Sequence, residues 1–192
     1  MIIQQEFMLV GVLDGTHSAI RRAKIEGGSI YNLTGGPLSN SNRTTLNDIY
    51  IHQTGGEIDV VTAGAGTSAT YGNRIVALTG GKVNYSAFGG SNGNGGTGSN
   101  DARVNGASFV YVGGDAQIGD ATLVANGTKI YTTVEAGSVF GIGNGRSGVE
   151  GAGSNDNSNV IIDGNARILG NVYGGRQLWC YRSCCYCKYK CN

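Results

Sequence analysis

A repeat punctuated by glycine is the feature that most limits how this chain can fold. Residues 74–90, RIVALTGGKVNYSAFGG, contain two short apolar segments, each followed by a Gly-Gly pair. Related segments recur, and the first corner of each predicted copy falls at Gly27, Gly55, Gly80, Gly113, Ala136 and Gly164. The steps are 28, 25, 33, 23 and 28 residues, and a period of about 20–50 residues is typical of stacked repeats.

Around each corner, apolar and polar residues alternate with a period of two. Such alternation predicts strands with one buried and one solvent-exposed face. One copy is too thin to bury its own apolar face, so we expect the copies to stack and continue each other's backbone ladder. This stacking places Ile25, Ile51 and Val76 in one interior column. Three residues after the corner, the inward positions are Ile30, Ile58 and Val83.

The pattern predicts an all-β fold, a right-handed parallel β-helix (β-solenoid) of about six irregular coils over residues 23–175. Residues 1–22 lack the repeat and are expected to form an N-terminal cap or a partial coil. A β-sandwich is the alternative, because Gly-Gly pairs also suit hairpins. The solenoid is favoured because each unit is two strands plus a polar loop that recurs on the same side. These loops are residues 37–45, 67–73, 91–106 and 146–159, and they either form a binding surface or only tolerate insertion.

The composition narrows the class of protein. With 35 Gly, one Pro and no Gly-X-Y period the chain is not collagen, and 40% hydrophobic residues are too many for a disordered linker. The net charge is +1 and no basic stripe runs through the chain, so we expect no nucleic-acid partner. No apolar run is long enough for a membrane helix, so no membrane insertion is expected in this segment. The first ten residues make a poor signal peptide, and we expect this segment to be part of a longer chain.

Residues that could carry chemistry do not form a recognisable pattern. A polysaccharide-cleaving enzyme needs carboxylates on one face of adjacent coils, but Asp59, Asp115 and Asp163 stand at unequal distances from their corners. His17 lies in a turn-like setting and is interpreted as a solvated turn residue. Two G-x-G-x-x-G matches, at 93–98 and 143–148, precede no predicted helix. No catalytic residue, cofactor or metal ligand is therefore assigned. Seven tyrosines either form an outward ladder able to stack on sugar rings or pack across strands: Tyr31, Tyr50, Tyr71, Tyr85, Tyr111, Tyr131 and Tyr173.

The last 17 residues, 176–192, differ from the rest of the chain. They contain no Gly, the single Trp and all five Cys: Cys180, Cys184, Cys185, Cys187 and Cys191. The spacing suits neither a paired C-x-x-C zinc site nor a disulfide framework. Written in plausible codons and read one base out of frame, this tail becomes GNYGAIGAVATANTNV, which has the composition of the repeat. We predict that it is a frameshifted end that is not part of the fold.

The corner motif G-G-x-[IV] resembles the Gly-rich repeats of bacterial surface proteins with parallel β-helices, such as autotransporter-like adhesins and cell-wall repeat proteins. It occurs as GGSI at 27–30, GGEI at 55–58 and GGKV at 80–83, and NVYGG at 171–175 resembles their second corner. The resemblance implies an extracellular or cell-surface, non-catalytic structural or adhesive segment, with surface glycans or host or cell-wall components as partners. The alternative is a carbohydrate-binding or polysaccharide-cleaving, pectin-lyase-like β-helix.

Overall fold

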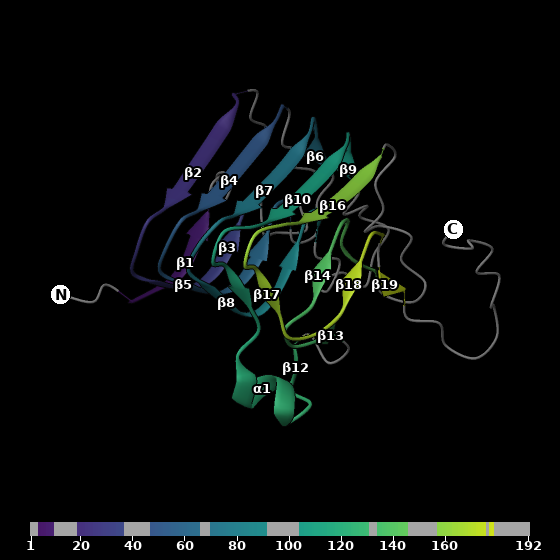
Figure 1. The fold of residues 1–192 in the computed structure, drawn as a ribbon. Coiled ribbons are helices and arrows are strands. Elements are labelled where there is room, and N and C mark those ends of the chain that lie inside the picture. Colours follow the sequence, from purple (N-terminus) through teal and green to yellow (C-terminus); the bar gives the residue numbers. More distant parts are fainter. Residues whose placement is uncertain are drawn as a thin grey trace.

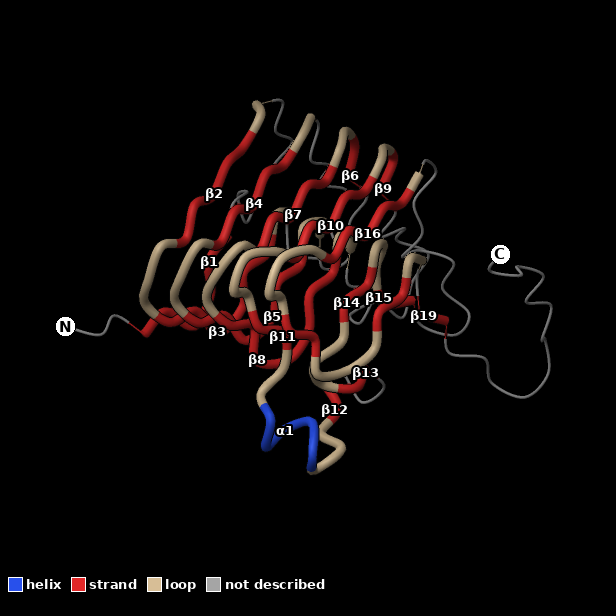
Figure 2. The backbone as a smooth tube through the Cα atoms, in the orientation of Figure 1, coloured by secondary structure: helices blue, strands red, loops and turns tan. Residues whose placement is uncertain are grey.

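The computed structural model describes residues 4–9, 19–36, 47–65, 70–91, 104–130, 134–145, 157–175 and 177–178. This part of the chain forms many short strands and one five-residue helix, α1 (Ala121–Ala125), which confirms the all-β prediction. Most strands belong to two parallel sheets that enclose the main apolar core between them (Figure 1, Figure 2).

The large sheet has eight strands and the other sheet has five. The path of the large sheet is β1 (Gln4–Leu9), β3 (Ser29–Thr34), β5 (Glu57–Thr62), β8 (Lys82–Phe88), β11 (Gln117–Ile118) and β17 (Arg167–Ile168), with β14 (Val139–Phe140) and β18 (Val172–Tyr173) beside it. The five-stranded sheet runs β2 (Arg21–Ile25), β4 (Ile49–Gln53), β7 (Arg74–Leu78), β10 (Ser108–Val112) and β16 (Ser158–Ile162). Short ladders join β6 (Thr70–Tyr71) to β9 (Val104–Asn105), β12 (Lys129–Ile130) to β13 (Val134–Glu135), and β15 (Asn144–Gly145) to β19 (Gln177–Leu178).

The chain alternates between the two sheets, and every ladder within them is parallel. We call one strand of the five-stranded sheet, with the chain up to the next such strand, a level. The predicted parallel, in-register stacking of Gly-cornered segments is confirmed. A sandwich built from hairpins would need antiparallel ladders in these sheets, so the alternative prediction is wrong on this point.

The inward columns agree with the prediction on one sheet and differ from it on the other. In the large sheet Ile30, Ile58 and Val83 are register partners, Ile58 and Val83 are fully buried, and Ile30 packs against the core. In the five-stranded sheet Ile51 and Val76 align with Ala23 rather than with Ile25. The predicted column was therefore offset by two residues at its first member. A two-residue offset keeps the same strand face, so alternation alone could not detect it.

The first corner depends on a left-handed backbone at one glycine per level. The φ angles are 84° at Gly28, 75° at Gly56, 78° at Gly81, 56° at Gly114 and 63° at Gly164. The register of β10 with β16 makes Gly164 the equivalent of Gly114. The last corner is therefore Asp163–Gly164, one residue earlier than the corner predicted to begin at Gly164, and Gly164 itself supplies the positive φ.

The second corner of a level follows its strand in the large sheet. Glycine is needed there for another reason, because neighbouring levels approach each other closely. Gly36 N donates to Gly64 O at 2.9 Å, and Gly64 N donates to Gly90 O at 2.8 Å, so these corners stack directly. A Cβ on Gly89 would overlap the carbonyl oxygen of Gly141 and would lie 2.5 Å from Ser108 Oγ. A side chain at these positions would force the levels apart.

The predicted fifth copy, with its corner at Ala136, is not a level. Equivalent residues at the start of each strand are Arg21, Ile49, Arg74, Ser108 and Ser158, which are 28, 25, 34 and 50 residues apart. The segment around Ala136 instead pairs antiparallel, β13 with β12. The described residues therefore hold five strands of this sheet and six along the path of the large sheet, and the copy predicted at Ala136 is wrong.

The long fourth level contains an insertion. The inward positions Val83 and Ala87 of the third level are four positions apart in the sequence. Ile168 and Val172, the equivalent positions of the fifth level, are also four positions apart. In the fourth level the equivalent residues are 118 and 139, a step of 21, so 17 residues are added. We call residues 120–136 the inserted segment; its described parts, 120–130 and 134–136, include α1, β12 and β13, and α1 projects from the large sheet (Figure 2).

The predicted end regions are described only in part. Within residues 1–22, β1 forms the edge strand of the large sheet. Within residues 176–192, Gln177 and Leu178 pair with Asn144 and Gly145. The rest of the tail, including its five cysteines, lies outside the described residues, as do the predicted loop 37–45, most of the loops 91–106 and 146–159, and residues 67–69 of the loop 67–73.

Candidate functional site: a pocket beside the inserted segment

The inserted segment begins with α1, whose start follows from the local sequence. The Asp120 carboxylate accepts hydrogen bonds from the backbone N–H groups of Thr122 at 2.9 Å and Leu123 at 3.2 Å, as a helix N-cap does. Lys82 Nζ, from β8, donates to the other Asp120 oxygen at 2.5 Å. The Lys82 hydrogen bond, and then the Leu123 N–H, hold the pKa of Asp120 below its ordinary value. Gly127, with φ 61°, turns the chain back toward the sheet.

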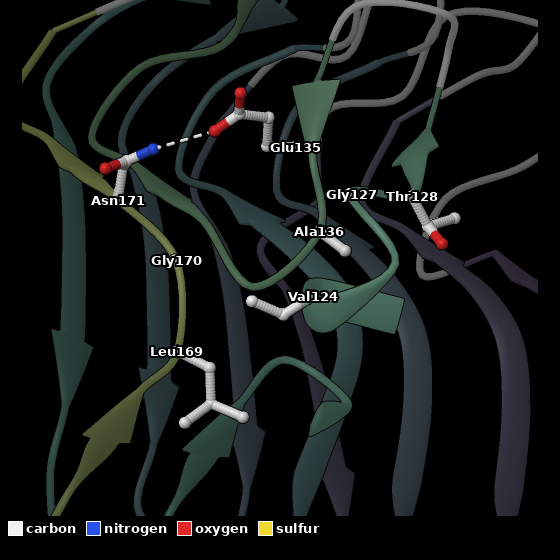
Figure 3. A pocket seen from close by; sticks show the side chains of 8 residues that line it. All are labelled: Val124, Gly127, Thr128, Glu135, Ala136, Leu169, Gly170 and Asn171. Atoms are coloured by element: carbon white, nitrogen blue, oxygen red, sulfur yellow. Dashed lines mark hydrogen bonds between the residues drawn. The ribbon is translucent and has the colours of Figure 1, made fainter. Parts of the chain in front are cut away.

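A pocket of about 340 Å³ lies between the inserted segment and the turn from β17 to β18. It is lined by Val124, Gly127, Thr128, Glu135, Ala136, Leu169, Gly170 and Asn171 (Figure 3). Asn171 Nδ2 donates to Glu135 Oε2 at 3.0 Å, so one polar pair joins the fourth level to the fifth. A second bridge, from Gly170 N to Gly137 O at 3.0 Å, fixes the backbone beside it.

The lining suits binding better than hydrolysis. Glu135 and Asn171 are exposed and offer acceptors and an amide donor, Thr128 adds a hydroxyl, and Val124 and Leu169 add aliphatic surface. Polar groups beside apolar surface are what a small polyhydroxylated ligand requires. The lining holds a single carboxylate, whereas glycoside hydrolysis ordinarily needs two, about 5–10 Å apart.

The three aspartates considered in the sequence lie in separate structural pairs. Asp59 Oδ1 accepts from Asn84 Nδ2 at 2.7 Å on the large sheet. Asp115 Oδ1 accepts from Asn165 Nδ2 at 3.1 Å. Asp163 Oδ2 accepts from the hydroxyl of Tyr111 at 3.3 Å. Asp115 and Asp163 lie at the same stacked corner of the fourth and fifth levels but are bound by different partners, and Asp59 lies apart on the large sheet.

The described tyrosines do not form one ladder. Tyr50 lies on the outer face of β4, where the Arg22 guanidinium carbon is 5.2 Å from its ring centroid. Its register partners on the next two levels are Ile75 and Phe109, so no second tyrosine continues the column. Tyr31 and Tyr71 are exposed on other strands. The predicted position Tyr131 lies outside the described residues.

The aromatic ladder that does form was missed in the sequence. Phe140 lies between Phe88 and Tyr173, with ring centroids 5.0 and 4.8 Å apart and rings within 11° and 6° of parallel. Val134 from the inserted segment packs with Phe88 and Phe140 in a cluster separate from the main core. The signal was present, because in three successive levels an aromatic residue directly precedes the second-corner glycine.

Sequence reasoning also missed the pocket, because residues 130–145 were interpreted as a repeat copy. Two signals could have revealed the insertion. The segment DATLVANG has an N-cap residue, helix-forming residues and a terminal glycine in order. The next unambiguous strand, VIID at 160–163, begins about 50 residues after its counterpart VYVG at 110–113.

Several predictions fall on residues outside the described part. These are His17, the match at 93–98, the second half of the match at 143–148, and all five cysteines. Among the described residues, no group of three or more His, Cys, Asp or Glu side chains is placed to hold a metal ion. The one helix in the part that the structure describes, α1, has five residues and is far too short to cross a membrane.

Comparison with protein families, curated proteins and solved structures finds no match to this chain.

Proposed function

We propose that this chain is a right-handed parallel β-helix that serves as a non-catalytic structural or adhesive segment of a secreted or cell-surface protein. The observation that carries the proposal is the continuous stack of five levels, in which each strand extends the ladder of the one before. A stack of this kind is nearly one-dimensional, and its length and exposed surface grow with each level added. Such a construction suits a stalk or an extended adhesive face.

The exposed residues support an adhesive role. Phe109 and Ile161 lie on the outer face of the five-stranded sheet and are 39% and 54% exposed. Arg22 and Tyr50 stack on the same face. Aromatic residues and arginine are enriched where proteins contact partners. This outer face therefore presents contact chemistry across successive levels.

The carboxylates support a non-catalytic role. Those of Asp59, Asp115, Asp120 and Asp163 each accept hydrogen bonds from side chains or backbone that join elements of the stack. Each is occupied in a structural contact with a different partner, and only Asp115 and Asp163 share a corner of the stack. A general acid and its partner carboxylate would instead face one shared space.

The test is a binding and cleavage assay on the purified chain. We expect retention on immobilised cell-wall polysaccharides or host-surface glycans without release of reducing ends or unsaturated sugars. Release of either product by the wild-type chain, abolished by a single carboxylate substitution, would overturn the non-catalytic proposal. Protease shaving of intact cells that express the complete gene tests the proposed surface location, and an unshaved, cytoplasmic product would contradict it.

A second candidate, carbohydrate binding at the pocket, is favoured by the Glu135–Asn171 pair. Glu135→Gln and Asn171→Ala change the polar lining and should weaken binding of a saccharide found on a glycan array by about tenfold, since a hydrogen bond to a charged group contributes about 1.5–3 kcal/mol. Asp163→Asn is the matched control, because it alters a carboxylate at a distant corner. Equal affinity in all three variants would exclude the pocket as the binding site.

A further inference from the structure

Two arginines begin strands of the five-stranded sheet and point to the same side. Arg21 opens β2 and Arg74 opens β7, and both are register partners of Ile49, which lies between them. Ile49 is fully buried, so this column faces the interior of the stack. Adjacent strands are about 4.8 Å apart, so the two arginine backbones are separated by roughly twice that distance.

Arg74 is fully buried and is bound only by neutral acceptors. Its Nη1 donates to the carbonyl oxygens of Asn47 and Asn73, each at 2.9 Å, and its Nη2 donates to Tyr71 O at 2.6 Å. None of the residues in the described part of the chain accepts a hydrogen bond from its Nε. Burial lowers the pKa of Arg74 to about 10, against the opposing effect of Asp48. The guanidinium is held firmly while its charge remains poorly compensated.

The hydrogen-bonding capacity of the Arg21 guanidinium is satisfied even less than that of Arg74. Its side chain reaches inward from a half-buried position, and both terminal nitrogens, Nη1 and Nη2, are buried with no hydrogen-bond partner among the described residues. Burial lowers the pKa of Arg21 as well. A guanidinium presents its N–H groups as a planar fork, and an unpaired buried fork of this kind is costly.

The nearest counter-charge does not neutralise both arginines. Asp48 acts on Arg74, but its Oδ1 accepts from the backbone N–H of Asn73 at 2.7 Å and its Oδ2 from the Tyr50 hydroxyl at 3.2 Å. Arg21 also acts on Arg74 as a like charge. Among the residues that the structure describes, these two cations therefore share one carboxylate, and that carboxylate already accepts hydrogen bonds from other donors.

We propose that this end of the stack binds a small inorganic oxyanion, phosphate or sulfate, on the buried Nη1–Nη2 fork of Arg21, with Arg74 supplying a second, fixed positive charge. An oxyanion can accept both N–H groups of the fork at once, which is the arrangement that guanidinium geometry favours. It would supply the missing negative charge without displacing Asp48 from its donors. This site lies at the start of β2 and β7, away from the pocket beside the inserted segment.

The experiment is thermal unfolding of the full chain at pH 7 in sodium phosphate, sodium sulfate or sodium chloride, all at the same ionic strength. We expect the Tm of the wild-type protein to rise saturably with phosphate or sulfate relative to chloride. In Arg21→Gln the apparent affinity for the oxyanion should fall at least tenfold. Arg22→Gln is the matched control, because it removes the same charge one residue along, on the outer face of β2, and it should retain the wild-type response.

Two results would overturn the proposal: no oxyanion effect beyond chloride in the wild-type chain, or the same effect in Arg21→Gln. The first would also be found if a carboxylate of the chain itself occupied the fork. Phosphorus-31 line broadening of phosphate by the wild-type protein, reversed by added sulfate, decides the matter even if Arg21→Gln does not fold. Sharp, unshifted phosphate resonances would exclude the site.

Discussion

Gly89 illustrates how one missing Cβ sets the spacing between two levels. It lies in the second corner of the third level, pressed against Gly141 of the fourth and against Ser108 Oγ. Its backbone has no unusual φ, so the need for glycine is a matter of space. The first corner is different, because Gly28 has φ 84° but has nothing within 4 Å of a Cβ position.

Gly89→Ala should therefore destabilise the protein by overpacking, by about 1–3 kcal/mol or more. Gly27→Ala is the control, since its Cβ would meet nothing within 4 Å and its φ is not left-handed. It should be neutral or stabilising by up to about 1 kcal/mol, because alanine restricts the unfolded chain. Urea unfolding monitored by circular dichroism measures both, and equal midpoints for the two variants would contradict the close-approach explanation.

Asp120 makes the folded protein sensitive to acid. Its pKa is lowered in the folded state, chiefly by Lys82, so the ionised carboxylate stabilises the fold above the ordinary Asp pKa of about 4. This stabilisation is lost as the pH falls through the lowered, folded-state pKa. Asp120→Asn keeps a good N-cap but lacks the charge.

We expect Asp120→Asn to be less stable than the wild type at pH 7, with the difference shrinking as the pH falls below about 4. Thermal unfolding across this pH range measures the effect. Asp163→Asn, at an exposed corner, controls for the general loss of one negative charge. A difference between Asp120→Asn and the wild type that stayed constant with pH would show that the Lys82 contact contributes nothing through ionisation.

At the scale of elements, the inserted segment can be separated from the level that carries it. A Cβ on Gly119 would lie 2.8 Å from the Cα of Gly137, so the two ends of the insertion nearly meet. Gly119 N donates to Val83 O at 2.7 Å, and Ala87 N donates to Ser138 O at 3.1 Å, so the ladder with β8 resumes directly after the insertion. Joining residue 119 to residue 137 restores the four-residue step of the neighbouring levels.

Deletion of residues 120–136 should leave a folded protein with the same parallel sheets. We expect lower stability, because Val134 no longer covers Phe88 and Phe140, and we expect complete loss of any ligand bound at the pocket. Circular dichroism and proton NMR dispersion report the fold, and ligand titration reports the pocket. A deletion variant that is unfolded would show that the inserted segment is an integral part of the fourth level.

The aromatic ladder should contribute unequally along its length. Phe140 is fully buried between two rings, and Phe140→Ala should cost about 3–5 kcal/mol. Tyr173 ends the stack and is 38% exposed, so Tyr173→Ala should cost markedly less. Denaturant unfolding of both variants tests this order, and a larger loss for Tyr173→Ala would contradict it.

Alternation and glycine spacing were sufficient to predict parallel stacking, the inward faces and most first corners. Ile58 and Val83 were placed correctly because the corner residues around them are regular. The fourth level could not be predicted in this way, because Val134 and Gly137 imitate a strand and corner although β13 pairs antiparallel with β12. The pocket and the Arg21–Arg74 pair depend on register between residues 30 to 60 positions apart, which no local pattern specifies.

Across the whole molecule, the two ends of the stack differ. In the first level Ala23 and Ile25 are buried, although β2 is an edge strand of its sheet. In the fifth level the equivalent end of the five-stranded sheet leaves Ile162 43% exposed, and Val172 of the large sheet is 47% exposed. Apolar burial therefore decreases toward β16 and β18.

Hydrogen exchange should follow this gradient. Amides of β16 should exchange at least about tenfold faster than those of β4 and β7, which are paired on both sides and enclose a buried core, because regions with little buried surface open locally first. Mass spectrometry of peptides from these strands measures the ratio. Uniform protection from β4 to β16 would indicate a single cooperative unit and would contradict the gradient.

The stacked second-corner glycines have a consequence for how such a chain can diverge. From Gly36 to Gly141 these glycines are confined by atoms of the level next to them, so a lone substitution there affects two levels at once. Duplication or loss of an entire level, by contrast, preserves the contacts between the second corners of neighbouring levels. Related proteins should therefore vary in the number of levels, and in insertions such as residues 120–136, more freely than in the residue at any single second corner.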